Sequence, residues 1–197
     1  MLLVIDANIV LSALVKGRLT GLILSPMLEL VAPERLFEEI GRNKGEILAR
    51  SSFSAADFEA LLALLEKNIR IVPLEDIISF VPEAEKILGG HRKDVPFLAL
   101  ALKSCCSVWS YEKRFKRIGG IVSLTTAEVR KMLRIFGEYL KAGKLSDEDR
   151  KFCEKVGWHP ADEFPLRDEV IKELKAREES SGKPMTLDEF NKWCDSL

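Results

Sequence analysis

Acidic residues recur in this sequence at four positions where an α/β fold would bring them together. Asp6 directly follows the apolar run LLVI, and Asp94 precedes the apolar stretch VPFLALALKS. Glu38 and Glu39 are adjacent, and Glu112 follows the run CCSVW closely. Carboxylates held close together repel one another, and a divalent cation removes that repulsion. Because carboxylate oxygens are hard ligands, such a cluster favours Mg²⁺ or Mn²⁺ over zinc.

Each of these residues also has an ordinary structural role available. Asp6 and Asp94 could cap the helices that follow them, because aspartate is a preferred N-cap residue. The Glu38–Glu39 pair could lie on a solvated helix face, and Glu112 could pair with basic neighbours in YEKRFKR. For a single residue the structural role is favoured. The order of all four positions, and their placement at strand ends, favours a shared site.

The elements that would position these residues alternate between strands and helices. Short runs rich in branched apolar residues predict strands near residues 2–5, 29–32, 69–72, 105–109 and 121–124. Helical patterns lie between them in NIVLSALV, TGLILSPML, PERLFEEIGRN, FEALLALLEKN and DVPFLALALKS. Pro33 suits the first position of the third helix, and Ser54 with Asp57 resembles a capping box before the fourth. The alternation predicts an α/β fold with a parallel sheet covered on both faces, which binds ligands at the carboxyl ends of its strands.

The last third of the chain has helical patterns and no catalytic pattern. A long helix is predicted from about Thr126 to Ala142. Charged amphipathic segments follow, with Ser146 and Thr186 as predicted N-caps. We expect this part of the chain to pack on the domain or on a partner.

Composition limits the class of protein. Among the 197 residues, 47% are hydrophobic, so a sizeable core is expected; 30 basic and 31 acidic residues give a net charge of −1, so any nucleic-acid surface must be local. No apolar run reaches the roughly 18 residues that span a bilayer, so we expect no membrane segment. The N-terminus has no basic leader and no small-residue cleavage site, and its apolar run meets a charge at Asp6, so we expect no signal peptide.

The cysteine pattern bears on location and on metal chemistry. Four cysteines without C-x-x-C spacing predict buried, reduced thiols in a cytoplasmic protein. A zinc site from Cys153, His159 and Cys194 fits none of the common zinc spacings. With His91 and His159 as the chain's two histidines, histidine-driven catalysis is not favoured.

Several stretches together resemble the PIN-domain family of nucleases, which includes the VapC toxins. They are LLVIDANIVLSAL, VAPERLFEEIGR, HRKDVPFLALAL and VWSYEKRF, followed by IVSLTTAEV. The resemblance implies a three-layer α/β/α sandwich with a central parallel sheet. It assigns residues 1–133 to a PIN-like nuclease domain and leaves residues 134–197 as a helical C-terminal extension.

The same resemblance implies a set of site residues. The family's acidic residues match Asp6, Glu39, Asp94 and Glu112, and Glu39 is preferred to its neighbour because an aliphatic residue follows it. We expect Asp6 and Asp94 to bind Mg²⁺ or Mn²⁺ directly, and Glu39 and Glu112 to act through water or on a second ion. Substrate contacts are expected from Asn8, Ser12, Arg92, Lys93, Ser110 and Lys113.

Glu112 departs from the family pattern, in which aspartate is usual. Glutamate is one methylene longer, and Mg²⁺ requires near-ideal octahedral geometry. Arg114, a basic residue, stands at the next position where the family favours a polar or acidic residue. The number of metal ions therefore stays open.

The function implied by the resemblance is that of a metal-dependent endoribonuclease that cleaves single-stranded RNA. Expected partners are RNA, an antitoxin-like or other protein of a toxin–antitoxin pair, and a second copy of the chain in a homodimer. The alternative is a PIN-like RNA- or protein-binding module with a weakened site. Arg35 and Arg42 on the Glu39 helix, and the basic residues around Asp94 and Glu112, could contact phosphates or simply be solvated.

Overall fold

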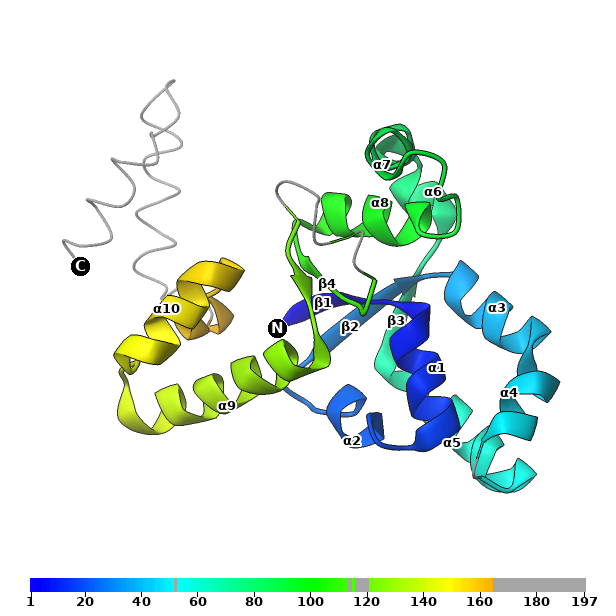
Figure 1. Ribbon diagram of the computed structural model, residues 1–197, viewed down its shortest axis with the longest axis horizontal. Helices are drawn as coiled ribbons and strands as arrows, with labels where there is room; N and C mark the ends of the chain where they lie inside the picture. Colours follow the sequence, from blue (N-terminus) through cyan, green and yellow to red (C-terminus); the bar gives the residue numbers. More distant parts are fainter. Residues whose placement is uncertain (52, 113–114, 116–120, 165–197) are drawn as a thin grey trace. The chain divides into compact units, whose positions relative to one another are not determined.

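A computed structural model of the chain describes residues 1–51, 53–112, 115 and 121–164. Its strands form one sheet in the order β3-β2-β1-β4-β5, and every neighbouring pair is parallel (Figure 1). The strands are β1 (Leu2–Ile5), β2 (Glu29–Pro33), β3 (Ile69–Val72), β4 (Ser107–Trp109) and β5 (Ser123–Leu124). The predicted parallel sheet is confirmed.

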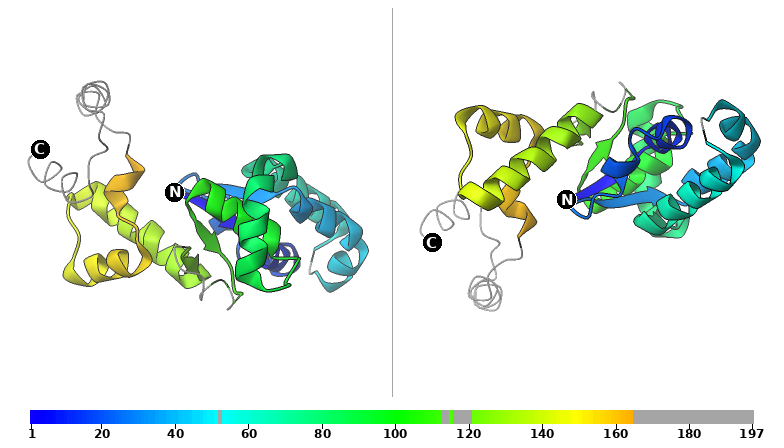
Figure 2. Two further views of the ribbon diagram at one scale, coloured as in Figure 1. Left: turned by 90° about the horizontal axis from the view of Figure 1, so that it is seen from above. Right: turned by 90° about the horizontal axis from the view of Figure 1, so that it is seen from below.

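Helices cover both faces of this sheet, as the α/β/α prediction requires. Helices α6 to α8 lie on one face, whereas α1 and α5 lie on the other (Figures 1 and 2). The helices are α1 (Ala7–Lys16), α2 (Thr20–Ile23), α3 (Arg35–Arg42), α4 (Lys44–Arg50), α5 (Ala55–Asn68), α6 (Leu74–Ile77), α7 (Val81–Leu88), α8 (Val95–Ser104), α9 (Thr126–Ala142) and α10 (Asp147–Val156), with short 3-10 turns at η1 (Ile78–Phe80) and η3 (Pro160–Glu163).

Several predicted boundaries need correction. Pro33 is the last residue of β2 rather than the first of a helix, because pairing with β3 continues through it and the Glu34 amide donates to the Val72 carbonyl at 3.1 Å. β4 begins at residue 107 rather than 105, because the Cys106 amide still donates to the Ala101 carbonyl of α8. β5 contains only residues 123–124, and the helix predicted in TGLILSPML contains only residues 20–23.

Side-chain caps define the starts of three helices. Ser54 accepts from the Asp57 amide at the start of α5, which is the N-cap half of the predicted capping box, and its hydroxyl donates to Asp57 Oδ2. Ser146 accepts from the Asp149 amide at the start of α10, as predicted. Thr125 and Glu128 form a complete capping box at the start of α9. Sequence reasoning missed this box, although the T-x-x-E spacing is its ordinary signature.

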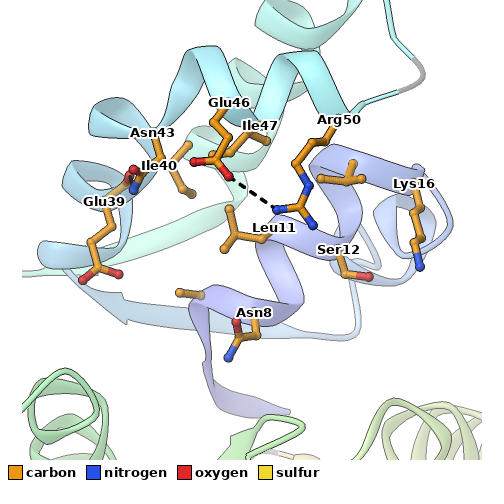
Figure 3. Close-up of a pocket in the computed structure, with 12 residues that line it drawn as sticks. Asn8, Leu11, Ser12, Lys16, Glu39, Ile40, Asn43, Glu46, Ile47 and Arg50 are labelled. Carbon is orange, nitrogen blue, oxygen red and sulfur yellow. Dashed lines mark hydrogen bonds and ion pairs between the residues drawn. The ribbon is translucent and has the colours of Figure 1, made fainter. Parts of the chain in front are cut away.

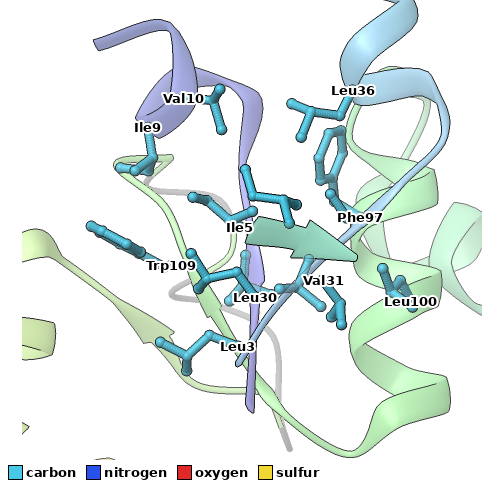
Figure 4. Packing of buried hydrophobic residues seen from close by; sticks show 14 of the residues in the cluster. Leu3, Ile5, Ile9, Val10, Leu30, Val31, Leu36, Phe97, Leu100 and Trp109 are labelled. Atoms are coloured by element: carbon cyan, nitrogen blue, oxygen red, sulfur yellow. The ribbon is translucent and has the colours of Figure 1, made fainter. Parts of the chain in front are cut away.

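The core fixes the strand ends on which the site depends. Ile5 and Trp109 are fully buried at the ends of β1 and β4, and Phe97 and Leu100 of α8 pack on the sheet (Figure 4). β1 is a continuous apolar run because both of its faces are covered. Residues that follow β1 and β4 are therefore held by a rigid base.

Two of the cysteines depart from the prediction of buried thiols. Cys153 is buried, but Cys106 is half-buried and Cys105 is exposed at the end of α8, where its φ of 47° is left-handed. All three are free thiols. Burial raises the pKa of the Cys106 thiol to about 11, which keeps it protonated at neutral pH.

The chain divides into two compact units, residues 1–160 and 161–197. The predicted domain boundary after residue 133 falls inside α9, and it stays a prediction. Lys113, Arg114, Thr186 and Cys194 lie outside the described residues. Within the described ranges, no helix is both long and apolar enough to cross a membrane.

Candidate active site

The site begins at the point where the strand order of the sheet changes direction. From β1 the chain proceeds to β2 and β3 on one side and later to β4 and β5 on the other. Ile5 pairs with Trp109 in the register of β1 and β4, so Asp6 and Ser110 are the next residues beyond the two strands. Open α/β sheets bind ligands at this position, outside the carboxyl ends of the strands.

Asp6 is a buried carboxylate with a hydrogen-bonded support. The residue is only 5% exposed, and the fully buried Ser110 donates a hydrogen bond from its hydroxyl to Asp6 Oδ2. Ser110 Oγ in turn accepts from the Glu112 amide at 2.9 Å, which orients the hydroxyl. Because Ser110 is fully buried and its hydroxyl is engaged by both Asp6 and the Glu112 amide, the structure favours a role in orienting Asp6, and its predicted contact with substrate stays a prediction.

Burial has the largest influence on the ionisation of the Asp6 carboxyl. Burial raises the pKa of the Asp6 carboxyl, the Ser110 hydrogen bond opposes this, and the nearby Asp94 carboxylate raises the pKa further. The Asn8 and Ala7 amides lower the pKa, yet the Asp6 side chain makes no capping hydrogen bond to α1. The Asp6 carboxylate therefore interacts with the first amides of α1 without a full capping hydrogen bond, and it accepts its hydrogen bond from Ser110.

Asp94 lies at the start of α8, directly after the basic residues Arg92 and Lys93. It occupies the N-cap position without a side-chain capping hydrogen bond. A hollow of about 460 Å³ is lined by Asp94 and by the exposed His91, Arg92 and Lys93. Gly90, with φ of 97°, lets the chain turn into this loop. The structure thus places the predicted substrate contacts Arg92 and Lys93 beside Asp94.

Glu39 lines a separate pocket of about 550 Å³ between α1, α3 and α4 (Figure 3). Asn8 and Ser12 line the same pocket, so three predicted site residues are brought together there. The Glu39 carboxylate accepts from Arg35 Nε at 3.0 Å, and Arg42 pairs with Glu38 at 2.8 Å. Both arginines that were considered for phosphate contact are therefore engaged within α3.

Sequence reasoning missed the basic end of this pocket. Figure 3 shows Lys16 and Arg50 on the side away from Glu39. A signal was available, since Asn8, Ser12 and Lys16 follow one another at four-residue spacing and so share one face of α1. The pocket therefore extends along α1 from the candidate site toward two cations.

Among the predicted acidic residues, Asp94 influences Asp6 electrostatically, whereas Glu39 lines a different pocket. Within the described ranges, no three His, Cys, Asp or Glu side chains form a group that could hold a metal ion. Convergence of Asp6, Glu39, Asp94 and Glu112 on one ion stays a prediction. The Asp6–Asp94 pair nevertheless fits a hard divalent cation, because oxygen ligands of like charge are stabilised by such an ion.

Comparison with protein-family models identifies one family for this chain. A family model described as PIN domain matches residues 4–134, a range that contains all four predicted acidic residues. Among solved structures, a chain in the crystal structure of VapBC2 from Rickettsia felis bound to a DNA fragment from their promoter is 13% identical, with a TM-score of 0.48. The alignment covers 64% of this chain and 98% of that one. The search of curated proteins found no match.

Proposed function

Because the chain belongs to the PIN-domain family, a family of nucleases, we propose that it is a Mg²⁺- or Mn²⁺-dependent endoribonuclease that hydrolyses single-stranded RNA. The observation that carries the proposal is the buried Asp6 carboxylate, held by Ser110 at the switch point of the sheet. A carboxylate is thereby held where an α/β sheet binds its ligand, within electrostatic reach of Asp94, which raises the pKa of Asp6.

The residues have distinct roles in this proposal. Asp6 and Asp94 hold the ion directly, whereas Glu39 and Glu112 act through water. When bound, the ion supplies polarisation of the scissile phosphate and a lower pKa for the attacking water. Arg92 and Lys93 lie exposed beside Asp94, where they would contact the phosphates that flank the cleaved bond.

A catalytically weakened RNA- or protein-binding module is the second candidate. Two observations favour it: Glu39 is already paired with Arg35, and Glu112 is longer than the aspartate usual in the family. Such a module would bind single-stranded RNA and show no turnover in Mn²⁺. On the family resemblance alone, we also propose a cytoplasmic location, a homodimer and an antitoxin-like protein partner.

The test is turnover of a labelled single-stranded RNA by the wild-type chain and the Asp6→Asn variant, in Mg²⁺, in Mn²⁺ and in chelator. We expect chelator to abolish cleavage and Asp6→Asn to lower it by about 100-fold or more, since an ion's charge stabilisation is worth several kcal/mol and 1.36 kcal/mol is tenfold. Asp147→Asn changes the same charge on α10, where the side chain is 92% exposed, and serves as the control. Cleavage that persists equally in the Asp6→Asn variant and in chelator would refute the proposal.

The stability of Asp6→Asn separates a chemical role from a structural one. The raised pKa means that the ionised carboxylate is less favourable in the folded protein than in the unfolded chain. We therefore expect the variant to melt at the same temperature as the wild type or higher at pH 7. A loss of activity accompanied by unfolding would leave the binding-module alternative standing.

A further inference from the structure

Tyr111, an exposed aromatic residue, follows Ser110 in the sequence. Tyr111 is 50% exposed, and it lies just beyond the carboxyl end of β4. The Ser110 amide donates to the Leu124 carbonyl at 3.1 Å, so Tyr111 stands beside the residues that follow β5. The ring is therefore at the same edge of the sheet as the candidate active site.

The hydroxyl of this tyrosine is tied to the protein. Tyr111 Oη and Thr126 Oγ1 are 2.5 Å apart in a hydrogen bond, and Thr126 Oγ1 also accepts from Trp109 Nε1 at 3.1 Å. Since the polar end of Tyr111 is already engaged, what the residue offers to a ligand is its ring. An aromatic face stacks on nucleobases and tolerates any base, because every base has a π-face.

Thr126, which binds the Tyr111 hydroxyl, is itself held in place by the structure around it. Thr126 is the first residue of α9, directly after the capping box in which Glu128 Oε2 accepts from the Thr125 amide at 2.8 Å. The other oxygen of Glu128 accepts from Lys155 of α10 at 3.2 Å. A ring that is positioned before binding loses less conformational entropy when a ligand stacks on it.

From this geometry we propose that Tyr111 is a stacking platform for an unpaired nucleobase next to the cleaved bond. The proposal rests on the proposed function and deepens it. It states that the site recognises a base as well as phosphates, and it explains a preference for single strands, whose bases are free to leave the stack. Exposed Tyr111 would contact substrate, whereas Thr126 would position it.

The experiment compares Tyr111→Phe with Tyr111→Leu in the full chain. Both variants lose the hydrogen bond to Thr126, but only the second loses the aromatic ring, so their difference reports the ring alone. Binding is measured by fluorescence anisotropy in chelator, using a labelled single strand of roughly 12 nucleotides. The same strand with abasic positions keeps its phosphates and removes the stacking partner.

We expect Tyr111→Leu to weaken binding of the intact strand about tenfold and to bind the abasic strand as the wild type does. The affinity of Tyr111→Phe for the intact strand should stay within about threefold of the wild-type value, because this variant keeps the ring and loses only the hydrogen bond to Thr126. Leu140→Ala removes a side chain that is 55% exposed near the far end of α9, and it should leave binding unchanged.

The outcomes separate this inference from the proposed function. If the wild type binds and cleaves RNA while both Tyr111 variants bind it equally well, the stacking role is refuted and the nuclease stands. If both variants lose affinity equally, the hydrogen bond between Tyr111 and Thr126 matters and the ring does not, which also refutes stacking. If the wild type neither binds nor cleaves single-stranded RNA, the proposed function itself fails.

Discussion

Ser110 donates a hydrogen bond to Asp6 across 104 residues of sequence, and this bond joins the ends of β1 and β4. Hydrogen bonds to charged groups contribute roughly 1.5–3 kcal/mol. We expect Ser110→Ala to lower the free energy of unfolding by about that amount at pH 7, and to lower cleavage at least tenfold as Asp6 loses its orientation. Urea unfolding and RNA turnover measure the two effects.

The neighbouring strand offers a matched control for this change. Ser123 on β5 is also buried, and its hydroxyl has no hydrogen-bond partner within the described residues. Ser123→Ala should therefore be neutral or stabilising. In an Asp6→Asn background, Ser110→Ala should cost less, because the charged acceptor is gone. An equal cost in both backgrounds would show that Ser110 acts through packing.

Glu112 allows the predicted action through water to be tested. Its amide is fixed by Ser110 Oγ, so a shorter side chain moves the carboxylate back by about one methylene. We expect Glu112→Asp to keep cleavage within about threefold, and Glu112→Gln to lower it about tenfold, as is typical of outer-shell groups. Turnover in Mg²⁺ and Mn²⁺ provides the measurement. A strong gain of Mn²⁺-dependent cleavage by Glu112→Asp would instead show that glutamate disables a second ion position.

Local pattern was enough to predict most of the fold. Apolar runs identified all five strands, and the helix Thr126–Ala142 was predicted at its observed bounds, because these signals depend on near neighbours in the sequence. The support of Asp6 by Ser110 was not predicted, since it depends on which strands pair and in which register. The left-handed Cys105 could not be anticipated either, because glycine is the usual residue at such a position.

The basic end of the Glu39 pocket should contribute to RNA affinity. Lys16 and Arg50 line it, and Arg50 is held only loosely by Glu46 at 3.6 Å. Each phosphate contact on a single strand contributes about 0.7 to the slope of log K against log salt concentration. We expect Lys16→Gln and Arg50→Gln each to reduce that slope by about this amount, in anisotropy titrations at several salt concentrations.

A third cation of the same region controls for net charge. Lys44 on α4 pairs with Glu59 at 2.5 Å and does not line the pocket. Lys44→Gln should leave the salt dependence nearly unchanged. If all three variants reduce the slope of log K against log salt concentration equally, the effect comes from net charge. That outcome would contradict the prediction that RNA phosphates contact Lys16 and Arg50 in the pocket.

The contact between α9 and α10 predicts how stability depends on pH. The Ser146 hydroxyl donates to Asp149 at 2.7 Å and lowers the pKa of that carboxyl, and Arg134, which donates at 2.6 Å, lowers it further. A carboxyl whose folded pKa lies below its unfolded value of about 3.9 stabilises the protein above that pH. The stabilisation is lost as pH falls through the folded pKa.

We therefore expect Asp149→Asn to be less stable than the wild type at pH 7, with the difference shrinking below about pH 4 and vanishing at lower pH. Urea unfolding across a pH series measures this difference directly. Asp147→Asn is the control, because that side chain is 92% exposed and lies 3.9 Å from Arg150, where solvent screens the pair. A stability difference for Asp149→Asn that stays constant from pH 7 to pH 3 would show that packing of the side chain, and not its charge, joins the two helices.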